Sequence, residues 1–132
     1  MKAHALRLGP GEDLRLALEA FTRERGLRAA CVASCVGSLG TAQIRFAGEP
    51  EARAVAGPLE ILCVSGTLSP GGAHLHIGVA DATGRTTGGH LASGSIVHTT
   101  AEVVVLELDD LRFGREPDPA TGYRELTVAP ER

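Results

Sequence analysis

The stretch GGAHLHIGVA, residues 71–80, is followed after a short turn by GGHL, residues 88–91. Turn signals at residues 69–72 and 81–84 bound the first stretch, so we expect residues 73–80 to form a β-strand. On a strand, His74 and His76 point to the same face with Cα atoms about 6.5 Å apart. We expect residues 88–94 to be a glycine-rich loop that brings His90 to the same face. The pattern indicates a three-histidine site.

The composition is that of one soluble globular domain spanning residues 1–132. Hydrophobic residues make up 43% of the chain and charged residues 22%, which excludes a disordered protein. The chain holds three Phe, one Tyr and no Trp, so the core must consist of Val, Leu, Ile and Ala.

The order of the expected elements predicts the fold class. Residues 2–8 alternate as a strand, and residues 10–13 open a helix with an apolar stripe of Leu14, Ala17, Leu18 and Phe21. Short strands follow, separated by expected turns at residues 37–40, 48–50 and 57–58. We expect these strands at residues 28–36, 41–46, 51–56, 59–68, 73–80, 102–108 and 123–128, with a return strand beginning at residues 85–87. One helix followed by many closely spaced strands predicts an α+β fold with a mainly antiparallel sheet.

The first residues lack the apolar run of a signal peptide, and no stretch approaches the ~18 apolar residues of a membrane span. We therefore expect a cytoplasmic protein with no membrane partner. Cys31, Cys35 and Cys63 lie in apolar surroundings, which predicts reduced, buried thiols.

Several short motifs, taken in order, resemble the PPC domain, which occurs as a stand-alone prokaryotic protein and in plant AT-hook nuclear proteins. The motifs are residues 8–14, 37–39, 57–62, 74–76, 88–91 and 100–104. The resemblance implies an antiparallel sheet with flanking helices, assembled as a homotrimer. It also implies that His74, His76 and His90 bind a metal, as in the prokaryotic members.

The chemistry of the three histidines agrees with that implication. Neutral imidazole suits zinc or another divalent transition metal, and three histidines with one open position are typical of catalytic zinc. Same-face histidines also serve packing or hydrogen bonding, which is the alternative. Glu102 begins the strongest strand; it is a candidate for orienting a ligating histidine or acting as general base, or else a strand-end charge facing solvent.

Three hypotheses for function follow. The first is a regulatory module with the DNA-binding label of the family. Neither the net charge of −3 nor an AT-hook supports that label, because Gly84-Arg85 and Gly114-Arg115 lack the second arginine and the flanking prolines. The second is a metal-dependent enzyme acting on a small oxygenated molecule, decarboxylase- or hydrolase-like; the histidine spacing is similar to that of acetolactate decarboxylase. The third is a structural metal that locks the trimer.

Overall fold

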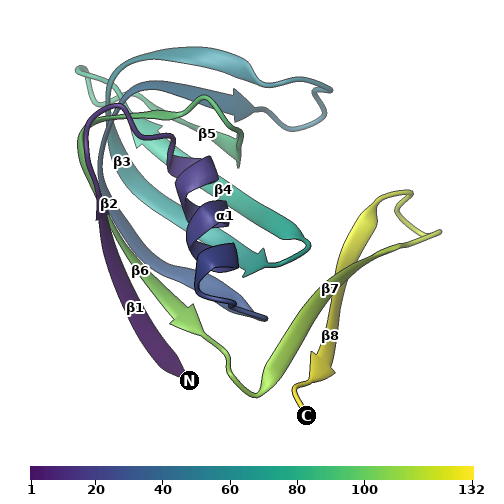
Figure 1. The fold of residues 1–132 in the computed structure, drawn as a ribbon. Coiled ribbons are helices and arrows are strands. Elements are labelled where there is room, and N and C mark those ends of the chain that lie inside the picture. Colours follow the sequence, from purple (N-terminus) through teal and green to yellow (C-terminus); the bar gives the residue numbers. More distant parts are fainter.

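The computed structural model describes all residues, 1–132 (Figure 1). Its elements in chain order are β1 (Lys2–Leu8), α1 (Leu14–Glu24), β2 (Ala30–Arg45), β3 (Arg53–Ser69), β4 (Gly72–Ala80), β5 (Thr86–Leu91), β6 (Ile96–Glu107), β7 (Leu111–Pro117) and β8 (Arg124–Pro130). Six strands form one antiparallel sheet in the order β1-β6-β2-β3-β4-β5. The mainly antiparallel sheet is confirmed. The expectation of several flanking helices is wrong, because α1 is the only helix.

The helix lies against the concave side of the curved sheet (Figure 1). Its N-cap is Asp13, whose Oδ1 accepts a hydrogen bond from the Leu16 N–H at 3.0 Å. The other oxygen, Oδ2, accepts from the Gly94 N–H at 2.6 Å, so the cap also holds the loop between β5 and β6. The side of the helix that packs against the core includes the four residues predicted from the sequence, Leu14, Ala17, Leu18 and Phe21, together with Thr22, which is also buried.

Strand β4 alternates between the two faces of the sheet. Leu75, Ile77 and Val79 are buried in the core, whereas His74 and His76 between them are exposed. The period of two that defines a β-strand therefore sends both histidines to the outer face.

The sheet curls far enough for its last strand to meet an inner one. Beyond its pairing with β4, β5 pairs with the end of β2, where Ile44 lies opposite Leu91 and Arg45 opposite His90. Strand β5 is thus held on both sides.

Two of the predicted turns are wrong. Residues 37–40 lie inside β2 and residues 57–58 inside β3, so each of these strands joins two shorter predicted ones. A Cβ on Gly37 would collide with the Thr100 carbonyl of β6, so this glycine permits close strand packing and does not mark a turn. A shift of register between Leu39 and Thr41 accommodates the curvature of β2.

Strands β7 and β8 form a separate two-stranded hairpin that extends away from the main sheet (Figure 1). The predicted strand at residues 123–128 corresponds to β8, while β7 was not predicted. The Phe113 N–H donates to the Arg28 carbonyl at 3.0 Å and so anchors the hairpin to the chain that precedes β2.

The three cysteines are free, but only Cys35 is buried as predicted. Cys31 is half-buried and Cys63 is exposed, which corrects the expectation for both. Burial raises the pKa of the Cys35 thiol to about 11, so this thiol stays protonated. None of the helical segments has the length and apolar character needed to cross a bilayer.

We predict that Gly66→Ala lowers the free energy of unfolding by at least about 2 kcal/mol. Gly66 lies opposite Leu75 in the pairing of β3 with β4, has φ of +143°, and leaves no room for a Cβ beside the His74 carbonyl. Urea denaturation measures the loss. The control is Gly9→Ala, where a Cβ would meet nothing closer than Glu12 Oε2 at 3.8 Å. Equal stability of the two variants would contradict the prediction.

Candidate metal centre and the adjoining cavity

The three histidines predicted to form a site lie together on the outer face of the sheet. His76 and His90 are direct partners in the pairing of β4 with β5, and their ring centroids are 4.4 Å apart. His74 lies two residues before His76, with ring centroids 5.1 Å from His76 and 5.6 Å from His90. One nitrogen from each ring lies within 4.8 Å of the other two. The structure therefore brings all three imidazoles to one point.

His90 reaches this point from a strand and not from a loop, which corrects the expectation for residues 88–91. The glycines before it make the pairing possible. A Cβ on Gly88 would lie 2.8 Å from the Ile77 carbonyl oxygen, and one on Gly89 would lie 2.6 Å from the Arg45 carbonyl oxygen. The two glycines let β5 fit closely between β4 and β2, and this holds His90 beside His76.

The surroundings favour neutral imidazoles. Partial burial, followed by the nearby charges of His76 and Arg115, lowers the pKa of His74 below its ordinary value. Partial burial, followed by the charge of Arg45, lowers the pKa of His90 in the same direction. No carboxylate forms an ion pair with any of the three rings. The lone pairs of His74 and His90 are therefore available to coordinate a cation.

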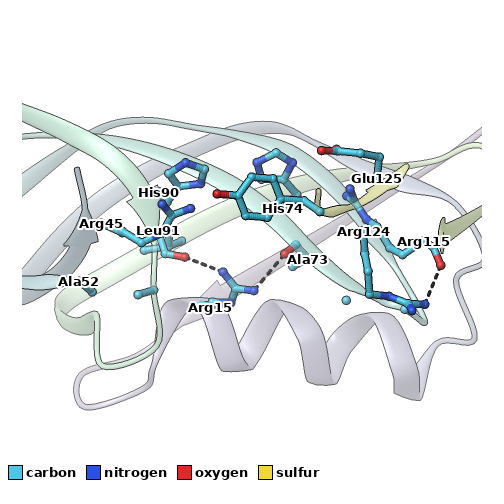
Figure 2. Close-up of a pocket in the computed structure, with 14 residues that line it drawn as sticks. Arg15, Arg45, Ala52, Ala73, His74, His90, Leu91, Arg115, Arg124 and Glu125 are labelled. Atoms are coloured by element: carbon cyan, nitrogen blue, oxygen red, sulfur yellow. Dashed lines mark hydrogen bonds between the residues drawn. The ribbon is translucent and has the colours of Figure 1, made fainter. Parts of the chain in front are cut away.

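One residue of α1 braces the two histidine strands from beneath (Figure 2). Arg15 Nη1 donates to the Leu91 carbonyl at 2.7 Å, and its Nη2 donates to the Ala73 carbonyl at 2.9 Å. These carbonyls belong to the residues next to His90 and His74. The Glu19 carboxylate in turn accepts from Arg15 Nε at 2.9 Å. Arg15 is thus a positioning residue for the site.

The sequence analysis missed Arg15. Its only local signal was its place off the apolar stripe of the helix. Its partners lie 58 and 76 residues away, and only the folded chain reveals them.

A cavity of about 710 Å³ adjoins the histidines, and both His74 and His90 line it (Figure 2). Arg45 of β2 lies beside His90 at one end, and the hairpin of β7 and β8 supplies the other end. A second hollow of about 130 Å³ is lined by residues of β3 together with His74 and His76. The histidine cluster therefore sits between two hollows, with His74 bordering both.

Glu102 does not join this site. It lies on β6, opposite Arg7 and Val36, and its side chain is exposed. Two strands, β2 and β3, separate β6 from β4, which corresponds to about 14 Å across the sheet. Within one chain Glu102 therefore lies apart from the three histidines and faces solvent, and its role in orienting a histidine or acting as general base stays a prediction.

The other two histidines are also apart from the cluster. His4 is half-buried, and its Nε2 lies 2.8 Å from Glu107 Oε2. His98 is exposed, and its Nδ1 contacts only the Thr99 hydroxyl at 3.1 Å.

Comparison with known proteins places the chain among relatives of two kinds. It is 50% identical over 128 residues to the bifunctional protein GlmU of Synechococcus sp. strain JA-3-3Ab, covering 97% of this chain and 21% of GlmU. The chain thus spans about a fifth of the length of this curated relative, and it spans the same share of a second Synechococcus GlmU.

Several solved structures share the fold over nearly their whole length. A hypothetical protein from Salmonella cholerae-suis is 40% identical with a TM-score of 0.97, covering 99% of this chain and 95% of that one. A metal-containing protein from Archaeoglobus fulgidus is 32% identical with a TM-score of 0.79, covering 96% and 94%. A proposed DNA-binding protein from Bacteroides thetaiotaomicron is 24% identical with a TM-score of 0.84, covering 95% and 91%, a level that shows the fold alone.

The model of one family matches residues 1–109, which is most of the chain. The matched part includes all six strands of the main sheet, the helix and the three histidines. The match confirms the resemblance carried by the ordered sequence motifs. The chain belongs to the family of the Plants and Prokaryotes Conserved domain, abbreviated PCC or PPC.

Proposed function

We propose that this chain is a homotrimeric PPC-domain protein in which His74, His76 and His90 bind a divalent transition metal, zinc first, and that this centre serves a small-molecule site. The observation that carries the proposal is the convergence of three imidazole nitrogens within 4.8 Å at the edge of a large cavity. The metal-containing description of the Archaeoglobus fulgidus relative supports it.

The donor set fits zinc. Zinc takes histidine nitrogens at about 2.0–2.1 Å. Within one chain the cluster consists of these three histidines, so one chain offers three nitrogen ligands. When bound, such a metal supplies Lewis acidity, which lowers the pKa of bound water and polarises a carbonyl. The adjoining cavity favours a site for a ligand or substrate over a metal that only locks the trimer.

An exposed apolar surface on the outer face supports the trimer. Val36, Leu62 and Val104 are 54%, 55% and 37% exposed on the face of the main sheet away from α1. The register that pairs Gly37 with Ile61 places Val36 next to Leu62. Association of this face with further copies of the chain would remove it from water.

The charge distribution favours a small ligand over duplex DNA. The chain carries a net charge of −3, and four of its arginines line one cavity. Duplex binding depends on many cations spread along a surface, where each contacts a phosphate. The DNA-binding description of the Bacteroides protein thus gains no support from the charges of this chain.

We expect wild-type protein purified without added metal to carry about one zinc per chain by elemental analysis, and His76→Ala to lose at least about 100-fold in zinc affinity. Removing one of three ligands leaves too few donors to hold the ion. Competition with a chromophoric chelator measures the affinity. His98→Ala is the control because that exposed ring lies outside the cluster. Equal zinc affinity of His76→Ala and His98→Ala would refute the site.

We expect light scattering to give three times the chain mass of 13.7 kDa. Leu62→Asp should shift the protein to smaller species, because it places a charge on the apolar outer face. Ala82→Asp adds the same charge at an exposed turn and should leave the mass unchanged. A wild-type monomer, or a trimer that survives Leu62→Asp, would count against this interface.

We expect gel-shift titration with AT-rich and GC-rich duplexes to show no stable complex at about 0.15 M salt, because the net charge is −3 and four of the twelve arginines line one cavity. A complex that persists at this salt concentration, with affinity falling steeply as salt rises, would restore the DNA-binding hypothesis.

A further inference from the structure

The wall of the large cavity is strongly positive although the chain as a whole is negative. Arg15, Arg45, Arg115 and Arg124 line the cavity together with one acidic residue, Glu125. Their formal charge is +3, against −3 for the whole chain. The fold thus concentrates cations at this one place.

Three of these guanidinium groups have donors to spare. Arg45 donates only Nη1, to the Glu49 carbonyl at 3.2 Å. Arg115 donates only Nη2, to the Thr67 hydroxyl at 3.1 Å, and Arg124 only Nη2, to the Arg115 carbonyl at 2.7 Å. None of the three forms an ion pair with a carboxylate. Each guanidinium offers five N–H donors, so most remain available to a ligand.

The arginines approach from two sides of the histidines. Arg45 is the strand partner of His90, so both side chains project on the same face of the sheet. Arg115 comes from the hairpin, and its hydroxyl partner Thr67 lies opposite His74 in the sheet. Figure 2 shows His90 and His74 between Arg45 at one end and Arg115 with Arg124 at the other. An anion in the cavity would meet cations at both ends.

We propose that this cavity binds a small organic oxyanion, a carboxylate or a phosphate ester, through Arg45 and Arg115. Guanidinium groups match the planar geometry of such oxyanions and bind them through paired hydrogen bonds. The volume of about 710 Å³ suits a metabolite-sized molecule. The inference names the ligand class of the small-molecule site and to that extent rests on the proposed function.

The test is an NMR titration of the metal-loaded protein with glycerol 3-phosphate, with succinate and with uncharged glycerol. We expect at least one of the two anions to bind and glycerol to leave the spectrum unchanged. The two anions distinguish a phosphate site from a carboxylate site. Arg45→Gln and Arg115→Gln should each lower the affinity for the anion at least about tenfold, because each removes charged hydrogen bonds. Arg112→Gln is the matched control, since this exposed arginine also lies on β7 but does not line the cavity.

Failure of this inference is distinguishable from failure of the metal site. His76 does not line the large cavity, so His76→Ala should lose zinc and keep the anion. The two arginine variants should lose anion binding and retain zinc binding. Binding of neither anion, equal binding of glycerol, undiminished binding in both folded arginine variants, or loss of the anion in His76→Ala would overturn the proposal. Binding of duplex DNA that is lost in the arginine variants, without binding of either small anion, would also overturn it.

Discussion

The pairing of β5 with two strands at once is the constraint on which the site depends. On one side His90 faces His76 of β4, and on the other it faces Arg45 of β2. In an antiparallel sheet, directly opposite side chains share a face, so this double pairing places two imidazoles and a guanidinium in one row. A slip of one residue would turn His90 towards the core and remove its imidazole from this row. The curl of the main sheet therefore positions the side chains of the site.

Arg15 couples the helix to that row. Its two hydrogen bonds to backbone carbonyls fix the strands beside His74 and His90, and its charge also favours the neutral form of both rings. Arg15 thus both holds the two strands in place and favours neutral imidazoles through its charge. A metal bound above it would feel the same positive field, so the site requires either strong imidazole coordination or a compensating anion.

Local sequence patterns predicted the parts of this fold that depend on neighbours in the chain. The helix stripe, the same-face relation of His74 and His76, and the antiparallel sheet all follow from periodicity, and the structure confirms them. The predictions went wrong where glycine serves packing between strands. Gly37 and Gly89 suggested a turn and a loop, yet each lies in a strand and gives room to a neighbouring carbonyl. Sequence alone does not separate these two uses of glycine.

Long-range contacts account for what could not be predicted. The cavity joins arginines from α1, β2, β7 and β8, and no local spacing connects residue 15 with residue 115. Only the folded chain brings four of the twelve arginines together in one cavity. Glu102 was a candidate because it begins the strongest strand, and within one chain it lies three strand positions from β4.

The hairpin has a consequence for how such domains diversify. The family match ends at residue 109, whereas Arg115 and Arg124 lie beyond it on β7 and β8. Two of the four arginines that line the cavity therefore lie beyond the matched residues, whereas Arg15, Arg45 and the three histidines lie within them. Exchange of the last twenty or so residues would leave the histidines in place and give the cavity a different wall at its hairpin end.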